Sequence, residues 1–407
     1  MSRIIIIGAS HAGLACAERL RHHGFAGKIT IFEREEGLPL QRPPLSKTYL
    51  SAEKGASEEA YLLRKPDWFE VFDIDFQPGC KVISIDRKAG GITLADGRRE
   101  AYSELVIAAG AMPRHLPIAG GNAKGVFVLR VAREARAIRA QIRKAGKAVV
   151  IGGGYIGLEA AASLKTTGIE VEIVEMAPRL LARVASPELS DYCAELHQYK
   201  GVKIHCGAGV DEILCTSDGQ CRGVVLSDGW TLEADMVLAG IGVFPEATLA
   251  EQAGLAVNNG VLVSVQYQTE DAHIWSIGDV ARAPDVSETR IESIHHAQFS
   301  ASVAAAAITA SEMPPREAWW FWSDQYDVKF QMAGLVPAAS DKLVTITRKG
   351  RRENSLSVWS WLDGSLVAIE AANDGQAYMI GKKCLEAGRH PDPQNIASPE
   401  FPLKSLL

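Results

Sequence analysis

The sequence has few cysteines, and none of them stands in a recognisable redox or metal motif. Its seven cysteines include no C-x-x-C pair and no cluster with the spacing of metal ligands. Nothing between Cys16 and Cys80 could complete a redox-active cysteine pair early in the chain. The sequence therefore predicts no structural disulfide, no zinc site and no dithiol relay. The cysteines are at positions 16, 80, 193, 206, 215, 221 and 384.

The sequence also lacks an excess of basic residues and a long apolar run. It has 43 Lys plus Arg against 49 Asp plus Glu, a formal charge of -6, which argues against a nucleic-acid partner. Residues 301–310 fall short of the roughly 18 apolar residues of a membrane span, so we expect a buried helix there and no membrane insertion. The apolar run at residues 4–7 is too short for a signal peptide, and it predicts a first strand in a cytoplasmic protein.

What the sequence does contain is typical of a multidomain globular protein. The 407 residues are 47% hydrophobic and 23% charged, and at about 150 residues per domain they predict two or three domains. The 37 glycines are a slight enrichment, and glycine-rich turns are a common way to bind phosphate.

Residues 147–175 have the pattern of a dinucleotide-binding unit: a strand, a turn with three glycines, a helix and a second strand. In such a unit the backbone N–H groups of the turn face a pyrophosphate, and the acidic residue that ends the second strand binds a ribose hydroxyl. The sequence therefore predicts a nucleotide site here. Its motif residues are Gly152, Gly154, Gly157 and Glu175.

Residues 3–33 repeat this pattern with one change. Gly8, Gly13 and Glu33 occupy the corresponding positions, but Ser10 stands where a bare Cα normally lets the phosphate approach. A side chain there requires a small outward shift of the bound nucleotide. Residues 105–110 form an apolar strand that ends in small residues, and residues 273–279 form a strand that delivers an aspartate into a turn.

The composition changes after Pro314 and Pro315. The last 90 or so residues hold five of the eight tryptophans, and strand-like runs at 343–347 and 355–361 flank a basic turn at 348–352. The sequence thus predicts an α/β fold with two Rossmann-like dinucleotide-binding domains and a C-terminal α+β domain. The expected boundaries are residues 1–111 with 242–315, residues 112–241, and residues 316–407.

Together these motifs resemble the pyridine-nucleotide flavoprotein reductases of the glutathione reductase superfamily, and within it the FAD-dependent ferredoxin reductases of the putidaredoxin reductase and biphenyl dioxygenase reductase type. The resemblance covers nearly the whole chain. The matching strings are Arg42-Pro-Pro-Leu-Ser-Lys47, Gly152-Gly-Gly-Tyr-Ile-Gly-Leu-Glu159, Ala177-Pro-Arg-Leu-Leu-Ala-Arg183, Gly278-Asp279, Arg290-Ile-Glu-Ser293 and Phe321-Trp-Ser-Asp-Gln325.

The resemblance implies an FAD site in the domain formed by residues 1–111 and 242–315. Three positions depart from the family pattern: Ser10 replaces the middle glycine, Ala109 replaces a threonine, and Leu40-Gln41 replaces the residues that often precede R-P-P. The residues implied to contact FAD are Gly8, His11, Ala12, Gly13, Glu33, Arg42, Lys47, Val82, Ala109, Arg130, Asp279 and Ile294.

The resemblance places NADH in the domain of residues 112–241. Glu175 favours the free 2′-hydroxyl of NADH over the phosphate of NADPH, whereas Arg179 and Arg183 could accommodate that phosphate. The residues implied to contact NADH are Gly152, Gly154, Ile156, Gly157, Glu159, Glu175, Arg183 and Gly242.

Three residues are implied to take part in the reaction itself. Lys47 is either a cation near the flavin or a surface lysine, and Glu159 either positions nicotinamide and flavin or pairs locally. Trp322 is either an aromatic core residue or a ring between flavin and partner. His11 is expected to pack on the cofactor, and His295 and His296 to be structural.

Without a dithiol relay, hydride from NADH would reach FAD and electrons would leave singly to a protein acceptor. The resemblance implies a transient acidic [2Fe–2S] ferredoxin that serves a monooxygenase or dioxygenase. Alternatives are an NADH oxidase, rubredoxin reductase or monodehydroascorbate reductase, and a non-catalytic flavin-binding interaction protein. The basic residues at 348–352 are either a solvated hairpin turn or part of a docking surface for the ferredoxin.

Overall fold

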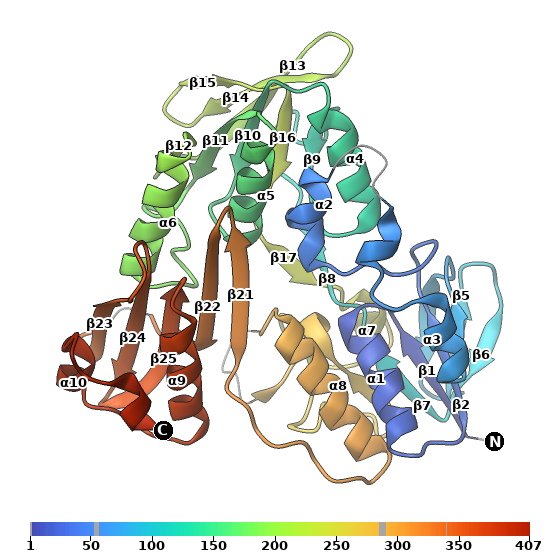
Figure 1. Cartoon of the computed structure of the whole chain (residues 1–407). Helices are drawn as coiled ribbons and strands as arrows, with labels where there is room; N and C mark the ends of the chain where they lie inside the picture. The colour runs from blue at the N-terminus through green and yellow to red at the C-terminus, as the bar shows by residue number, and fades with distance from the viewer. Residues whose placement is uncertain (1, 53–56, 285–289, 339) are drawn as a thin grey trace. The chain divides into compact units, whose positions relative to one another are not determined.

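The chain divides into two units by its internal contacts. In this computed structural model, residues 2–52, 57–284, 290–338 and 340–407 are described (Figure 1). The first unit consists of Met1–Gln41, Gly55–Met112 and Val243–Pro315. The second consists of Arg42–Lys54, Pro113–Gly242 and Arg316–Leu407.

A five-stranded parallel sheet forms the centre of the first unit, in the order β19-β7-β1-β2-β3. Residues Ile4 to Ile7 are buried, as expected for a parallel strand that is covered on both faces. The second strand predicted within residues 3–33 is confirmed at Lys28–Phe32. The strands are β1 (Arg3–Ile7), β2 (Lys28–Phe32), β3 (Ile74–Gln77), β7 (Glu104–Ile107) and β19 (Ile274–Ser276).

Two long helices of the first unit, α1 (His11–His22) and α8 (Ile294–Ile308), pack side by side (Figure 1). The helix expected at residues 301–310 is confirmed as part of α8, which begins earlier because the Ser293 hydroxyl accepts a hydrogen bond from the His296 N–H. The remaining elements are η2 (Glu58–Tyr61), α3 (Pro66–Val71), β4 (Val82–Asp86), β5 (Gly91–Leu94), β6 (Arg99–Ala101), β17 (Val243–Pro245), α7 (Thr248–Gln252), β18 (Val261–Leu262), η3 (Gly278–Val280) and β20 (Ala281–Arg282).

The second unit repeats this architecture with its own parallel sheet, in the order β12-β11-β10-β16-β9. The β-α-β pattern predicted from residue 147 is confirmed, because β10, α5 and β11 follow one another there. The elements of this part are η1 (Pro43–Ser46), α2 (Thr48–Ser51), β9 (Val126–Phe127), α4 (Ala132–Ile142), β10 (Lys147–Ile151), α5 (Tyr155–Thr166), β11 (Glu170–Glu175), α6 (Pro187–Tyr199), β12 (Lys203–Cys206) and β16 (Met236–Ala239). Strand β8 (Ala111–Pro113) lies where the chain passes from the first unit to the second.

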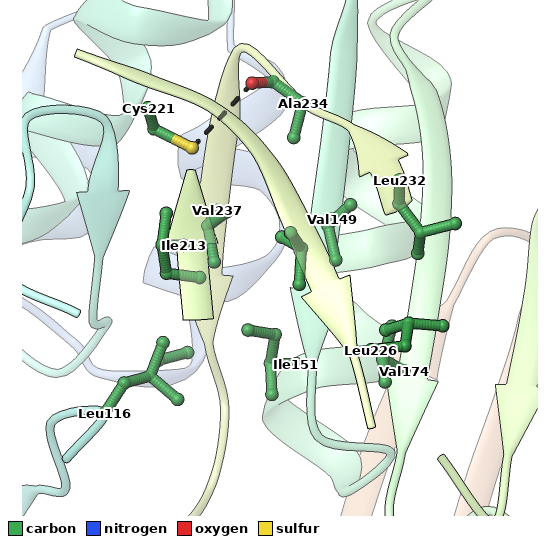
Figure 2. Close-up of a cluster of buried hydrophobic side chains, with 12 residues drawn as sticks. Leu116, Val149, Ile151, Val174, Ile213, Cys221, Leu226, Leu232, Ala234 and Val237 are labelled. Atoms are coloured by element: carbon green, nitrogen blue, oxygen red, sulfur yellow. Dashed lines mark hydrogen bonds between the residues drawn. The ribbon is translucent and has the colours of Figure 1, made fainter. Parts of the chain in front are cut away.

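A small antiparallel sheet, β13 (Val210–Cys215), β14 (Cys221–Leu226) and β15 (Thr231–Glu233), covers one face of this parallel sheet. Figure 2 shows the apolar cluster between them, in which Ile213 and Val237 are among the buried side chains. The Cys221 thiol lies at its margin and donates to the Ala234 carbonyl at 3.7 Å. The cluster holds the antiparallel sheet against the strands that carry the glycine-rich turn.

The C-terminal part of the second unit is an antiparallel sheet in the order β21-β22-β25-β24-β23. Trp359 and Trp361 are both buried and stack with 6.4 Å between ring centroids. Both strands predicted around the basic turn are present. The elements are β21 (Trp320–Gln325), β22 (Val328–Gly334), β23 (Leu343–Lys349), β24 (Leu356–Leu362), β25 (Ser365–Ala372), α9 (Gly375–Glu386), α10 (Pro393–Ala397) and η5 (Leu403–Leu406).

The basic turn is shorter than predicted, because β23 continues through Arg348 and Lys349. The Arg348 guanidinium binds four carbonyl oxygens of the C-terminal segment, those of Ile396 at 3.0 Å, Pro399 at 2.8 Å, Phe401 at 2.9 Å, and Ser398. Arg348 is therefore a structural residue, and Lys349, Arg351 and Arg352 are the exposed cations of this hairpin.

Replacement of Arg348 by alanine is expected to destabilise the protein by about 2 kcal/mol, since charged hydrogen bonds to partly buried carbonyls are lost. Limited trypsin digestion should then cut at Lys404 well before the rest of the chain. Arg351→Ala, in the same hairpin but exposed, serves as the control and should alter neither stability nor digestion. Equal digestion of the two variants would contradict the structural role of Arg348.

Two further features concern the helices and the cysteines. None of the helices in the described part of the chain is long and apolar enough to cross a membrane. All seven cysteines are free thiols.

Candidate functional site

Both glycine-rich turns place glycine where the backbone leaves no room for a side chain. Gly152 has φ +109°, and a Cβ there would lie 2.4 Å from the Gly240 carbonyl oxygen. A Cβ on Gly157 would lie 2.2 Å from the Gly152 carbonyl oxygen. The first unit leaves equally little room. A Cβ on Gly8 would lie 2.4 Å from the Ala108 carbonyl oxygen, and a Cβ on Gly13 would lie 1.9 Å from the Gly8 carbonyl oxygen. These contacts hold each strand, turn and helix close together.

The middle position of the turn is different. A Cβ on Gly154 would meet no atom within 4 Å, so the fold itself does not require glycine there. Gly154 and Ser10 are both the N-caps of the following helices, α5 and α1, and both have extended backbone. Space beside a helix N-terminus is what a bound pyrophosphate needs. The residues present therefore fit a dinucleotide in each unit, and the shift required by Ser10 concerns only the ligand.

Each turn is closed by the carboxylate that ends the second strand. Glu175 accepts hydrogen bonds from the N–H groups of Gly153 at 2.6 Å and Ala177 at 2.7 Å. In the first unit Glu33 accepts from Ala9 at 2.7 Å and Glu35 at 3.0 Å. An ionised carboxylate can accept about four hydrogen bonds, so each retains capacity for a ribose hydroxyl.

The other residues predicted in the first unit lie at the ends of strands and helices. Asp279 lies in η3, and a Cβ on the preceding Gly278 would be only 2.9 Å from the Ala12 side chain. Asp279 is therefore held near the first turn. Ala109 follows β7, His11 and Ile294 begin α1 and α8, and Val82 begins β4 with its side chain buried.

Lys47 and Glu159 form a buried ion pair in the second unit. The Glu159 side chain is 1% exposed and that of Lys47 is 14% exposed, with 2.7 Å between Lys47 Nζ and Glu159 Oε2. The Ser46 hydroxyl donates to the same oxygen at 2.5 Å, and the Ser323 hydroxyl donates to Oε1 at 2.7 Å. The structure thus brings together two of the three residues predicted to take part in the reaction. It also places them with two serines that sequence reasoning missed, although both serines stand within the quoted motifs.

Trp322 does not belong to this cluster. It precedes Ser323 in β21, and successive residues of a strand point to opposite faces. Its ring lies 5.6 Å from that of Trp320 and 6.5 Å from that of Phe321. Trp322 is half-buried in an aromatic group, so part of its ring is accessible.

Other predicted residues also lie in the second unit. Arg42 donates to the carbonyl of Arg130 at 2.6 Å. Gly242 has φ +93°, and a Cβ there would lie 3.8 Å from the Arg183 guanidinium, while Ile156 on α5 is 47% exposed.

Arg179 and Arg183 differ in their surroundings. Arg179 donates to backbone carbonyls of its own loop, including those of Ala182 at 3.3 Å and Ala185 at 3.0 Å. Its guanidinium therefore stabilises the conformation of this loop. Arg183 is exposed, and it is the residue of the two that is available to a nucleotide phosphate.

Comparison with known proteins agrees with this arrangement. The family model described as pyridine nucleotide-disulphide oxidoreductase matches residues 2–301, and that described as reductase C-terminal matches residues 320–407. Rhodocoxin reductase from Rhodococcus erythropolis is 37% identical, over 99% of this chain and 94% of the relative.

Two solved structures are similar over the whole chain. The ferredoxin reductase for the CYP199A2 system from Rhodopseudomonas palustris has a TM-score of 0.94 and 36% identity, covering 100% of this chain and 99% of that one. The reductase in the covalent putidaredoxin reductase–putidaredoxin complex has a TM-score of 0.93 and 34% identity, covering 100% of this chain and 98% of that one.

Proposed function

Because this chain belongs to the pyridine nucleotide-disulphide oxidoreductase family, we propose that it is an FAD-containing, NADH-dependent ferredoxin reductase that supplies an oxygenase. The observation that carries the proposal is the presence of two glycine-rich strand-turn-helix units in one chain, each closed by a carboxylate, together with the match to the reductase C-terminal family. Similar proteins that match this chain over nearly its full length are reductases of rhodocoxin and of a ferredoxin.

The two glycine-rich turns are proposed to bind different cofactors. Residues 1–111 and 242–315 bind FAD through Gly8, Gly13 and Glu33, residues 112–241 bind NADH through the Gly152 turn, and residues 316–407 form the C-terminal α+β domain. When held there, FAD would supply a group able to take up hydride from NADH and to give up electrons one at a time, as an iron–sulfur acceptor requires.

The protein supplies orientation and electrostatics for this reaction. We assign to Lys47 a fixed positive charge at the reacting end of the cofactors, and to Glu159 the role of holding its ammonium group. The part-accessible ring of Trp322 is assigned to the path between flavin and partner. The free thiols are consistent with a reducing compartment, and we propose a cytoplasmic location.

Anaerobic stopped-flow reduction by NADH, followed by mixing with [2Fe–2S] ferredoxins and with rubredoxin, tests the function. Rapid bleaching of the flavin and rapid reoxidation by one [2Fe–2S] protein are expected. Reoxidation by dioxygen or a quinone but by no iron–sulfur protein would indicate an NADH oxidase. A protein that NADH does not bleach would contradict the assignment of both nucleotide sites.

Replacement of Glu175 by alanine is expected to lower the preference for NADH over NADPH by about tenfold or more, measured as the ratio of the two kcat/KM values. The change removes a charged acceptor for the 2′-hydroxyl and the repulsion of a 2′-phosphate, while Arg183 remains nearby.

The matched control is Glu33→Ala, which removes the same carboxylate from the other turn. It should weaken retention of FAD and leave the NADH to NADPH ratio unchanged. A ratio that responds to Glu33 and not to Glu175 would mean that the two nucleotide sites are assigned in the wrong order.

A further inference from the structure

Behind the Lys47–Glu159 pair, polar side chains form a continuous buried line. Ser323 and Gln325 lie two residues apart on β21 and so share one face of the sheet. The Gln325 side-chain amide donates to the Ser323 hydroxyl at 3.1 Å, and its oxygen lies 2.9 Å from His197 Nε2 on α6. Ser323, Gln325 and His197 are each at most 1% exposed. A line of polar groups in such a place is costly unless each member is hydrogen-bonded.

The orientation of every donor in this line can be assigned. Burial lowers the pKa of His197 to about 4, so its ring is neutral at physiological pH, with one nitrogen donating and one accepting. The Cys193 thiol, whose pKa burial raises to about 12, donates to the Gln325 oxygen at 3.4 Å. That oxygen is therefore the acceptor, and His197 Nε2 carries the proton. The Nδ1 atom of His197 then accepts from the Tyr326 hydroxyl at 3.3 Å.

The result is a chain of hydrogen bonds in which all donors point the same way. Tyr326 donates to His197, His197 to Gln325, Gln325 to Ser323, and Ser323 to Glu159 Oε1. Each bond polarises the next and strengthens the last one, which ends on the carboxylate.

We propose that Ser323, supported by Gln325 and His197, is a positioning residue of the reductase. It fixes Glu159 Oε1, so that Oε2 is presented to Lys47 and the ammonium group stays where hydride transfer requires it. Apart from Glu159, the Lys47 ammonium contacts the Pro43 carbonyl at the longer distance of 3.3 Å. Without Ser323 the Glu159 carboxylate is held only at Oε2, by Ser46 and Lys47. It can then turn about that oxygen, and the position of the Lys47 ammonium changes with it. This inference rests on the proposed function, because the role of Lys47 does.

A role limited to packing between β21 and α6 is the competing explanation. A packing role predicts that loss of the Ser323 hydroxyl lowers the free energy of unfolding by the same amount whether residue 159 is Glu or Gln. A positioning role predicts that loss of the hydroxyl slows the reaction only while Glu159 is present, because Ser323 then affects the reaction only through Glu159.

The test compares Ser323→Ala with Ser360→Ala. Ser360 is 1% exposed and lies on β24 of the same sheet, and its hydroxyl has no hydrogen-bond partner within the described residues. Ser360→Ala therefore removes one buried hydroxyl from the same sheet without removing a hydrogen bond. In the full-length flavoprotein, Ser323→Ala should slow reduction of the flavin at saturating NADH about tenfold, with less than a twofold change in KM for NADH. Ser360→Ala should leave both at the wild-type values.

Two further readouts separate positioning from packing. The infrared carboxylate band of Glu159, identified by its loss in Glu159→Gln, should shift in Ser323→Ala and in Gln325→Met before NADH is added, and not in Ser360→Ala. In the Glu159→Gln background, Ser323→Ala should change the reduction rate less than twofold.

A tenfold loss that persists in that background, or an unshifted carboxylate band, would overturn the positioning role. If NADH fails to reduce even the wild-type flavin, the proposed function is wrong and the catalytic role of Ser323 falls with it. The infrared band would still show whether Ser323 holds Glu159, so the two failures are distinguishable.

Discussion

Replacement of Lys47 by alanine is expected to lower the free energy of unfolding by about 3–5 kcal/mol. The change leaves the Glu159 carboxylate, 1% exposed, buried without its counter-ion. Ser46 and Ser323 remain as donors, but a neutral hydrogen bond does not replace a positive charge at 2.7 Å. Equilibrium unfolding in urea, monitored in wild type and variant under the same conditions, measures the loss.

The double variant Lys47→Ala with Glu159→Gln shows where the loss comes from. Because the uncompensated charge has then been removed, the double variant is expected to be more stable than Lys47→Ala alone, by at least about 1 kcal/mol. Lys342→Ala is the control for removing a paired lysine at the surface, since Lys342 and Asp363 form a 3.0 Å pair with both side chains more than half exposed. Its expected cost is below about 1 kcal/mol. A double variant less stable than Lys47→Ala would contradict this account.

Glu370 is expected to reduce stability as the pH rises from about 4.5 to about 7. Its carboxyl group is fully buried on β25, and burial raises the pKa from 4.5 to about 7. The Ser186 N–H donates to both of its oxygens and Arg179 opposes the shift, whereas Glu188 adds to it.

The sign follows from proton binding. Between the two pKa values the folded state binds more protons at Glu370 than the unfolded state, so a rise in pH favours unfolding. A pKa shift of this size corresponds to about 3 kcal/mol of unfolding free energy. This contribution is lost as the pH rises from 4.5 to about 7, and none of it remains above that range. Glu370→Gln cannot ionise and lacks this dependence.

The measurement is the difference in unfolding free energy between wild type and Glu370→Gln across this pH range. The variant is expected to gain on the wild type steadily from pH 4.5 to pH 7, by about 3 kcal/mol in total, and to show no further gain at pH 8. Other carboxyl groups titrate in both proteins and cancel in the difference. A difference that is constant with pH would mean that folding does not change the pKa of Glu370.

The parts of the molecule that sequence reasoning predicted are those with a local pattern. Each nucleotide turn is contained in about thirty consecutive residues, and its glycines, strand and helix were predicted together. The strands that flank the basic hairpin were also predicted, since the alternation of residue types along each strand is visible within a few consecutive residues. The end of β23 was misplaced because Arg348 is held by a segment about fifty residues further along the chain.

The centre of the site was only half predicted for the same reason. Lys47 and Glu159 were singled out separately, from family resemblance, but their pairing joins residues 112 positions apart. Ser323 meets Glu159 across 164 positions, and His197 meets Gln325 across 128. Single-sequence periodicity carries no information about such distances. The missing signal was that the serines stand inside specific motifs, where a small polar residue next to a charged or aromatic one indicates a hydrogen-bonding role.

The closure of the two turns by Glu33 and Glu175 has a thermodynamic consequence. Each carboxylate already binds two backbone N–H groups of its own loop. The loops are therefore preorganised, and little conformational entropy remains to be lost when a nucleotide arrives. Contacts that the nucleotide makes with the turns can then contribute to affinity almost undiminished, which suits a protein that must retain one dinucleotide through many rounds of exchange of the other.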